Sequence, residues 1–263
     1  MYKYWYLLSI FIYKNVTKLT QRMIKFLRKK LILLPRFTGP LRAYYNYLFG
    51  EKEIRLLFKL INKFNNDFYF FDIGANYGIY TFLIGRKAKC VFVFEPIVEC
   101  INYIEKGFKN KSTEYINKVV SSNNEDREIR IPISLDEKIF GRSSVNNKFQ
   151  NYESRKLQSV SLDSFTSTKD LDKDTMSVVK IDAEGHELEI IEGANNFLKT
   201  DNLLLLIEIE KRHNPKFIEV FKGLISLGFE TYIVQNNNLV KLNSLNEALN
   251  KMSTNNNFIF KNF

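Results

Sequence analysis

The chain has 263 residues, and its 45% hydrophobic and 26% charged residues are typical of a folded globular protein, which excludes disorder over most of its length. Two cysteines and two histidines argue against a disulfide framework or a four-ligand zinc site, and favour a reducing compartment. The net charge of +10 is confined to residues 1–50, which hold ten Lys or Arg residues and no acid; the remaining 29 bases balance 29 acids. Overall basicity is therefore no argument that the rest of the chain binds nucleic acid.

Residues 1–50 are predicted to form a basic helical arm. Its apolar stretch at 4–13 is shorter than the roughly 20 residues that span a bilayer, and Lys14 to Lys18 follow where a signal peptide would have its cleavage site. From Trp5 to Phe26, apolar residues recur every three or four positions among basic ones, which is typical of an amphipathic helix. This helix could lie on an anionic membrane surface through residues 1–45, or pack on the body with a solvated basic face. We expect a cytoplasmic protein, peripheral on the inner membrane face in the first case.

Residues 51–263 are predicted to form one domain in which strands and helices alternate. Apolar runs predict strands at 68–73, 90–94, 177–182, 203–208, 229–234 and 258–260, with a further strand ending near 119–121. Helical spacing is found at 51–64, 77–88, 97–108, 187–198 and 215–227. Residues 123–157 are polar and predicted to be irregular, with a short hairpin at 128–133. The pattern predicts an α/β fold with a doubly wound, Rossmann-like parallel sheet, helices on both faces, and ligands at the carboxyl ends of the strands.

Two signals near the first predicted strands indicate a cofactor that contains a nucleoside. Gly74 and Gly78 follow Asp72 at the first strand-to-helix turn, where glycine allows close approach of a ligand to the backbone. Glu95 ends the next strand, where an acid can bind both hydroxyls of a ribose. The pyrophosphate-binding Gly-x-Gly-x-x-Gly pattern is absent, because Asn76 stands at its second glycine. An acid before the glycines suits a cationic amine, so S-adenosyl-L-methionine fits better than a dinucleotide.

The ordered motifs of residues 71–81, 92–96, 161–164 and 179–194 resemble the FkbM family of methyltransferases. The resemblance covers about residues 65–210 and implies an S-adenosylmethionine-dependent O-methyltransferase with a class I methyltransferase sheet, often acting on sugar hydroxyls or natural-product alcohols. It implies that the methionine end of the cofactor is bound around the first turn, the ribose at Glu95, and the adenine edge near Ser121. The cofactor residues expected on this basis are Asp72, Gly74, Ala75, Asn76, Gly78, Glu95, Pro96 and Ser121.

Four residues are candidates for orienting or deprotonating an acceptor hydroxyl. Asp182 ends the fourth predicted strand, and it is the first choice; His186 is the second, and Glu184 lies between them. Glu208, in an otherwise apolar strand, is expected to face the same crevice. In the alternative interpretation, Asp182 or Glu184 caps the helix that begins near residue 187. No metal is expected, because two carboxylates on neighbouring strands are not a complete magnesium ligand set.

The predicted acceptor is a hydroxyl-bearing small molecule or glycan, such as a bacterial surface polysaccharide or its precursor, and three alternatives remain. Tyr152 and Lys156, with Ser143 and Ser144 upstream, match the pattern of short-chain dehydrogenases, but chance explains such a pair in this composition. A nucleic-acid methyltransferase is disfavoured by the balanced charge of the body. A non-catalytic, membrane-attached scaffold would be expected to have lost the cofactor residues that are all present here.

Overall fold

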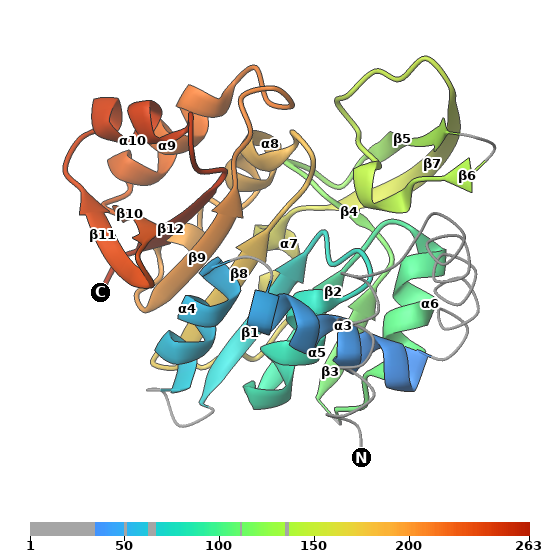
Figure 1. The fold of residues 1–263 in the computed structure, drawn as a ribbon, viewed down its shortest axis with the longest axis horizontal. Coiled ribbons are helices and arrows are strands. Elements are labelled where there is room, and N and C mark those ends of the chain that lie inside the picture. Colours follow the sequence, from blue (N-terminus) through green and yellow to red (C-terminus); the bar gives the residue numbers. More distant parts are fainter. Residues whose placement is uncertain (1–34, 50–51, 63–66, 111, 135–136) are drawn as a thin grey trace, which may run out of the picture.

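The computed structural model describes residues 35–49, 52–62, 67–110, 112–134 and 137–263, and Figure 1 shows their arrangement. Among these residues, an eight-stranded sheet has the order β11-β10-β12-β9-β8-β1-β2-β3. Its strands are β1 (Phe68–Ile73), β2 (Cys90–Phe94), β3 (Thr113–Ile116), β8 (Met176–Ile181), β9 (Leu203–Glu208), β10 (Glu230–Gln235), β11 (Asn238–Leu242) and β12 (Asn257–Lys261). The central strands are apolar on both sides, as expected for a sheet that is covered on both faces.

The predicted α/β fold is confirmed, although the sheet is mixed and not wholly parallel. Strands β3, β2, β1, β8 and β9 pair in parallel, whereas β12 is antiparallel to β9 and to β10, and β11 is antiparallel to β10. Asn236 and Asn237 both have positive φ, as a two-residue hairpin turn requires, and this turn joins β10 to β11. The sequence analysis missed β11, which follows this turn.

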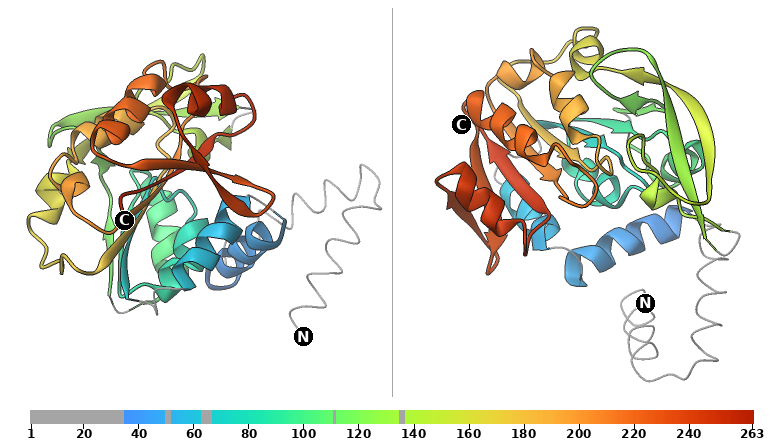
Figure 2. Two further views of the ribbon diagram at one scale, coloured as in Figure 1. Left: turned by 90° about the vertical axis from the view of Figure 1, so that its left-hand side faces the viewer. Right: turned by 90° about the horizontal axis from the view of Figure 1, so that it is seen from above.

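Helices cover both faces of the sheet, as the left view of Figure 2 shows. Alternate residues of β1 point to opposite faces: Phe68 and Phe70 pack with one group of helices, and Phe71 and Ile73 with the other. The first group is α3 (Pro35–Phe49), α4 (Lys52–Ile61), α5 (Ile79–Leu83) and α6 (Val98–Gly107). The second group is α7 (Leu162–Thr166), α8 (Glu187–Glu192), α9 (Phe217–Ser226) and α10 (Leu245–Lys251).

The prediction that residues 123–157 are irregular is wrong, because about half of them belong to a second, smaller sheet. Its order is β4-β7-β5-β6, and we call it the flap sheet. Its strands are β4 (Val119–Val120), β5 (Asp126–Ser134), β6 (Glu137–Lys138) and β7 (Tyr152–Val160). The predicted strand near 119–121 is divided between β3, in the large sheet, and β4, in the flap sheet. In Figure 1 the flap sheet stands at the upper right, beyond the ends of β1 and β2.

Two predicted helices are shorter than expected. The helix predicted at 77–88 consists of α5 and the 3-10 turn Gly85–Lys87, and the helix predicted at 187–198 ends at α8, with the 3-10 turn Phe197–Lys199 beyond it. The chain bends after α8 at Gly193, where a Cβ atom would lie 2.1 Å from the carbonyl oxygen of Ser121. This close approach brings the end of α8 against the beginning of the flap sheet.

The last part of the predicted arm, α3, packs on the body. Ala43 is buried in the core beneath α5, and Gly39 lies directly against the ring of Phe82. Residues 1–34, which hold the predicted amphipathic stripe, lie outside the described residues. No helix in the described ranges is long and apolar enough to cross a membrane.

Candidate active site

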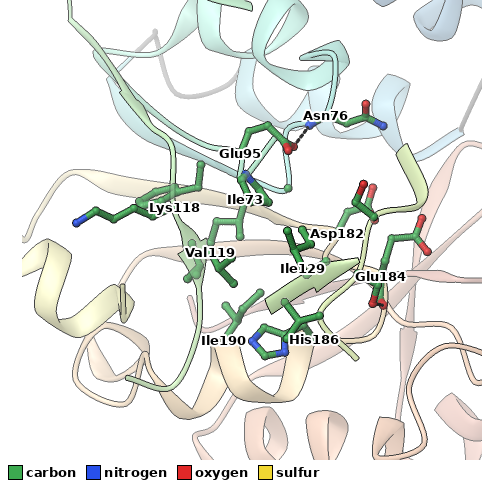
Figure 3. Close-up of a pocket in the computed structure, with 18 of the residues that line it drawn as sticks. Ile73, Asn76, Glu95, Lys118, Val119, Ile129, Asp182, Glu184, His186 and Ile190 are labelled. Carbon is green, nitrogen blue, oxygen red and sulfur yellow. Dashed lines mark hydrogen bonds between the residues drawn. The ribbon is translucent and has the colours of Figure 1, made fainter. Parts of the chain in front are cut away.

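A pocket of about 600 Å³, open to solvent, lies where the carboxyl ends of β1, β2 and β8 meet the flap sheet (Figure 3). Its position is the one expected for a ligand in an α/β sheet. The predicted residues on its wall are Gly74, Asn76, Glu95, Pro96, Asp182, Glu184 and His186. The pocket therefore brings together residues from both the predicted cofactor set and the predicted catalytic set.

The turn after β1 needs its glycine. Gly74 has φ +70, and a Cβ atom there would lie 1.9 Å from the carbonyl oxygen of Asp182, so a side chain has no room. The amides of Gly74 and Ala75 both donate to the carbonyl oxygen of Phe94, which fixes this turn to the end of β2. Asn76, which has φ 51, continues the turn and lines the pocket.

Glu95 is held by two backbone amides at the edge of the pocket. Its Oε2 accepts from the amide of Asn76 at 2.6 Å, and its Oε1 accepts from the amide of Ile97 at 2.8 Å. Burial raises the pKa of Glu95 to about 7, although these two donors favour the charged form. A carboxylate has about four lone-pair directions, so each oxygen can still accept a hydrogen bond from a hydroxyl in the pocket.

Four predicted cofactor residues lie behind the wall. Asp72 is wholly buried: its Oδ2 accepts from Thr81 Oγ1, its Oδ1 has no hydrogen-bond partner among the described residues, and burial raises its pKa. Ala75 and Gly78 support the turn, and a Cβ atom on Gly78 would lie 2.8 Å from Ile104. Ser121 is also buried, next to the pocket residues Lys118, Val119 and Val120. These four residues support the wall of the pocket but do not line it.

Lys180, which sequence reasoning did not consider, joins the two halves of the site. It pairs with Asp72 in the register of β1 and β8, and its buried Nζ lies 3.0 Å from Asp182 Oδ2 and donates to the carbonyl oxygen of Gly74 at 3.1 Å. Burial alone would lower the pKa of Lys180, but the carboxylates of Asp182 and Asp72 raise it above its usual value. Lys180 is thus a buried cation that neutralises part of the acidic charge beneath the turn.

Asp182 and Glu184 lie side by side on the pocket wall opposite Lys118 in Figure 3. Neither caps α8: the residue at its N-terminus, His186, gives no side-chain cap, and the carboxylate of Glu187 accepts from the amide of Gly185 at 2.9 Å. Burial, together with nearby carboxylates, raises the pKa of Glu184 to about 7. The helix-cap interpretation is therefore wrong for both acids.

Glu208 does not face the main pocket as expected. It lines a smaller hollow of about 190 Å³ behind Asp182 and Glu184, together with Glu210 and His213. His213 was not predicted, and its Nδ1 lies 2.8 Å from Glu184 Oε2. No group of three or more His, Cys, Asp or Glu side chains in the described part of the chain is arranged to hold a metal ion.

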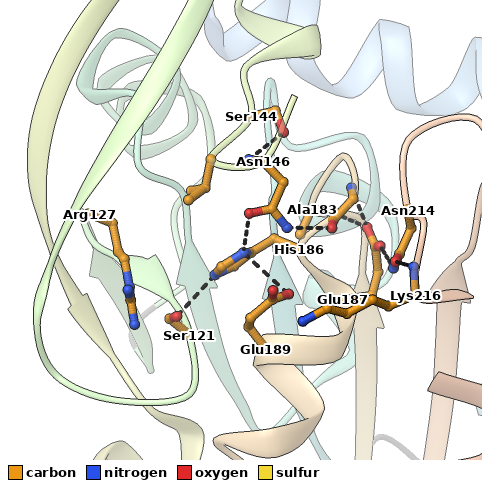
Figure 4. A network of polar contacts seen from close by, with 12 residues as sticks. Ser121, Arg127, Ser144, Asn146, Ala183, His186, Glu187, Glu189, Asn214 and Lys216 are labelled. Atoms are coloured by element: carbon orange, nitrogen blue, oxygen red, sulfur yellow. Dashed lines mark hydrogen bonds and ion pairs between the residues drawn. The ribbon is translucent and has the colours of Figure 1, made fainter. Parts of the chain in front are cut away.

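His186 lines the pocket with a buried imidazole whose two nitrogens both have neighbours (Figure 4). Nε2 lies 3.0 Å from Ser121 Oγ, and Nδ1 lies 3.4 Å from Asn146 Oδ1 and 3.5 Å from Glu189 Oε2. Burial lowers its pKa, so the neutral ring is favoured at neutral pH. With both nitrogens engaged, His186 is better suited to hold the flap than to accept a proton.

The flap sheet supplies the side of the pocket that sequence reasoning missed. Its strands contribute Val119, Val120 and Ile129 to the pocket wall, and the loop between β6 and β7 contributes Phe140, Gly141, Ser143, Ser144 and Val145. Ser144 Oγ donates to the carbonyl oxygen of Glu184 at 2.7 Å, and Asn146 Nδ2 donates to that of Gly185, also at 2.7 Å. The suggested dehydrogenase pair lies elsewhere, on β7, where Lys156 forms an ion pair with Asp126 and does not line the pocket.

Comparison with known proteins gives three findings. The family model described as the methyltransferase FkbM domain matches residues 72–248. The hexuronic acid methyltransferase AglP of Haloferax volcanii is 27% identical over 190 residues, which cover 72% of this chain and 73% of AglP.

Two solved structures are more distant, both at TM-scores below 0.5. The FkbM methyltransferase of Methylobacillus flagellatus has a TM-score of 0.43 and 13% identity, over 83% of this chain and 52% of that one, so about half of that protein is matched. The N-terminal domain of human METTL16, solved with SAH, has a TM-score of 0.38 and 12% identity, over 80% and 69%.

Proposed function

The chain belongs to the FkbM methyltransferase family and is a methyltransferase whose methyl donor is S-adenosylmethionine; from this premise, we propose that it methylates a hydroxyl oxygen of a sugar or glycan. The observation that carries the proposal is the single pocket at the ends of β1, β2 and β8. Gly74 and Glu95 line it together with Asp182 and Glu184. A nucleoside cofactor and a polar acceptor can therefore be bound in one cavity.

The residues of the pocket fit S-adenosylmethionine. Glu95 presents a carboxylate for the ribose hydroxyls, Gly74 and Asn76 bring the backbone of the turn to the pocket wall, and Val119 and Val120 offer an apolar edge for the adenine. Bound there, the cofactor supplies a methyl group on a positively charged sulfur. The chain has to orient an acceptor oxygen in line with that methyl group, and accept or release the hydroxyl proton.

A sugar acceptor is supported by the relative in Haloferax volcanii, whose name records methylation of a hexuronic acid. It is also supported by the pocket itself, because the carboxylates of Asp182 and Glu184 on its wall can accept hydrogen bonds from several hydroxyls. A nucleic-acid acceptor is disfavoured, because basic and acidic residues are equal in number beyond residue 50. We propose a surface polysaccharide or its precursor as the acceptor.

We also propose that the enzyme works on the cytoplasmic side of a membrane, bound peripherally through residues 1–45. Support comes from the acid-free basic sequence and from α3, whose outer face exposes Leu41, Tyr44, Tyr45 and Leu48. Cys90 and Cys100 are both free, which suits a reducing compartment. The proposed acceptor would then be a membrane-linked glycan precursor.

Two measurements on the purified protein test this function. Calorimetry should detect binding of S-adenosylmethionine and of its demethylated product, and no binding of nicotinamide cofactors. Labelled S-adenosylmethionine should then pass its methyl group to members of a panel of sugar nucleotides and lipid-linked sugars. Label found only on nitrogen, or only on RNA or DNA included in the panel, would contradict the proposal.

A further inference from the structure

We propose that the proton of the acceptor hydroxyl is taken by Glu184, and that His213 is the residue that positions this carboxylate. The inference rests on the proposed transfer of a methyl group to oxygen, and it assigns the proton to a residue other than Asp182, the first choice from sequence. His213 lies 31 residues beyond Asp182 in the chain and carries no sequence motif. Its place beside Glu184 is a product of the fold.

The backbone at Glu184 is held in an unfavourable conformation. Glu184 has φ 49 and Gly185 has φ 99, so a non-glycine residue occupies the left-handed region on a pocket wall. Two flap side chains fix the carbonyl oxygen of Glu184: Ser144 Oγ at 2.7 Å and Asn147 Nδ2 at 3.0 Å. Asn146 Nδ2 fixes the next carbonyl oxygen, that of Gly185. Such strain persists only where the surroundings enforce it, and here the enforced turn places Glu184 between the pocket and the smaller hollow, both of which it lines.

The other side of the same turn is fixed by the segment that carries His213. A Cβ atom on Gly185 would lie 2.3 Å from the carbonyl oxygen of His213, so the two backbones are in direct contact. Glu187 joins them further: its Oε1 accepts from the amide of Gly185 at 2.9 Å, and its Oε2 accepts from Asn214 Nδ2 at 2.8 Å. The distance of 2.8 Å between His213 Nδ1 and Glu184 Oε2 is therefore set by rigid contacts on both sides.

The charges around this pair favour a base that works near neutral pH. Glu184 interacts electrostatically with three carboxylates and one guanidinium, those of Asp182, Glu187, Glu210 and Arg142. His213 interacts in the same way with Glu210, Asp182, Arg142 and Arg212. Burial and the carboxylates raise the pKa of Glu184 to about 7, and burial lowers the pKa of His213. A neutral His213 donates from Nδ1 to the ionised Glu184, which leaves Glu184 Oε1 for the acceptor hydroxyl.

The neighbouring groups are less suited to this role. The Oδ2 of Asp182 lies 3.0 Å from the buried ammonium of Lys180 and is engaged in that ion pair. Both nitrogens of His186 have neighbours, in Ser121 and in Asn146 with Glu189. Glu208 lines only the smaller hollow. Glu95 also lines the pocket with a raised pKa, but two backbone amides hold its carboxylate, which we assign to the ribose. Glu184 is the remaining acid of the pocket wall whose raised pKa suits it to accept a proton.

The step balances as follows. The acceptor oxygen forms a bond to the methyl carbon, the bond from that carbon to sulfur breaks, and its electron pair stays on sulfur, which becomes neutral. The hydroxyl proton passes to Glu184, which becomes a neutral carboxylic acid and afterwards returns the proton to water. A positioned base of this kind contributes about 10²- to 10⁴-fold to the rate.

The test compares the pH dependence of methyl transfer in the full-length enzyme and four variants. In the wild type, the rate at saturating cofactor should rise with pH through about 7 as Glu184 loses its proton. Glu184→Gln should lower kcat by about 100-fold or more and abolish this rise. His213→Ala should move the rise to higher pH, because a lost donor disfavours the charged carboxylate. His213→Asn should restore the rise to about pH 7, because its amide nitrogen can replace Nδ1 as the donor.

Asp182→Asn is the matched control: it should keep a rise, moved to lower pH because one carboxylate that raises the pKa of Glu184 is gone, even if its overall rate falls. Persistence of the rise in Glu184→Gln, or its loss in Asp182→Asn, would overturn the assignment. If Glu184→Gln does not fold, the two His213 variants test the proposal. Equal pH dependence of methyl transfer in His213→Ala and His213→Asn would contradict the positioning role of His213. Calorimetry with S-adenosylmethionine separates this proposal from the proposed function. Every variant should bind the cofactor as the wild type does, whereas failure of the wild type to methylate any hydroxyl would refute the function itself.

Discussion

At the scale of single residues, the cofactor side of the pocket depends on the position of Glu95. Two backbone amides hold its carboxylate, so its orientation is fixed before a ligand arrives. Sequence predicted this residue and Gly74 because both belong to local patterns, an acid at a strand end and a glycine in a turn. It could not predict Lys180 or His213 in the same way, because their partners Gly74 and Glu184 come from other segments and meet them only in the folded chain.

Replacement of Glu95 by alanine is expected to weaken cofactor binding by about 1.5 to 3 kcal/mol, the scale of hydrogen bonds to a charged group. The pKa of Glu95 is raised to about 7, so the wild-type enzyme should bind S-adenosylmethionine more tightly as pH rises through that value, because the ionised form accepts better. The variant should lose this pH dependence. Calorimetry over that pH range measures both effects, and unchanged affinity would remove Glu95 from the ribose site.

Gly185→Ala tests the backbone contact that brings His213 to Glu184. The added Cβ atom would lie 2.3 Å from the carbonyl oxygen of His213, at φ 99, so we expect a loss of about 2 kcal/mol or more and a fall in Tm of roughly 4–8 °C. Gly228→Ala is the matched control, since Gly228 also has positive φ, at 88, but nothing within 4 Å of the added atom. If thermal unfolding shows equal losses for the two variants, the close contact at Gly185 has no energetic importance.

At the scale of elements, the flap sheet shows why residues 123–157 were predicted to be irregular. Strand β7 is mostly polar, with half-buried and exposed residues alternating along it until the buried residues at its end. Its partner β5 is stabilised across the pair by ion pairs such as Lys156 with Asp126, which an apolar pattern cannot reveal. The buried strands β1, β8 and β9 were predicted within one residue of their observed ends, because continuous apolar runs are the clearest strand signal.

Ser144→Ala should loosen the contact between the flap sheet and the turn after β8. The Ser144 hydroxyl donates to the carbonyl oxygen of Glu184 and accepts from the amides of Asn146 and Asn147, so its loss should cost about 1 to 3 kcal/mol. Hydrogen exchange of residues 144–147 and 183–186 should become faster. Ser143→Ala is the control, because Ser143 Oγ is buried without a hydrogen-bond partner among the described residues, and its removal should cost nearly nothing. Equal exchange in both variants would show that the flap is held by other contacts.

At the scale of the whole molecule, charge separates the chain into two parts. Every Lys and Arg in excess lies before Glu51, while the domain that carries the pocket is balanced. The structure adds that α3 belongs to the packed body, since Ala43 and Gly39 contact it, so the proposed membrane contact has to come mainly from residues 1–34 with the exposed face of α3 beside them. Sequence could not place this boundary, because the basic pattern continues unchanged into α3.

Vesicle flotation tests the proposed membrane contact. The full chain should float with anionic vesicles and not with neutral ones, and high salt should release it, because each of the eight bases in residues 1–34 contributes at most about 1 kcal/mol near an anionic surface. A chain that starts at Pro35 keeps α3 and should fold, retain methyl transfer to a soluble acceptor, and lose flotation. Equal flotation of the two chains, or none by the full chain, would contradict the proposal.

The central claim, methyl transfer to a sugar hydroxyl, is tested most directly by mass spectrometry of surface glycans and their lipid-linked precursors from cells with and without the gene. The account predicts one sugar residue that is heavier by a single CH₂ unit when the gene is present, with the added methyl group on oxygen. Restoration by the wild-type gene, and not by one encoding Glu95→Ala, should connect this mass difference to the pocket. Identical glycan masses in both strains, with a methyl group appearing instead on nucleic acid or on nitrogen, would contradict the account.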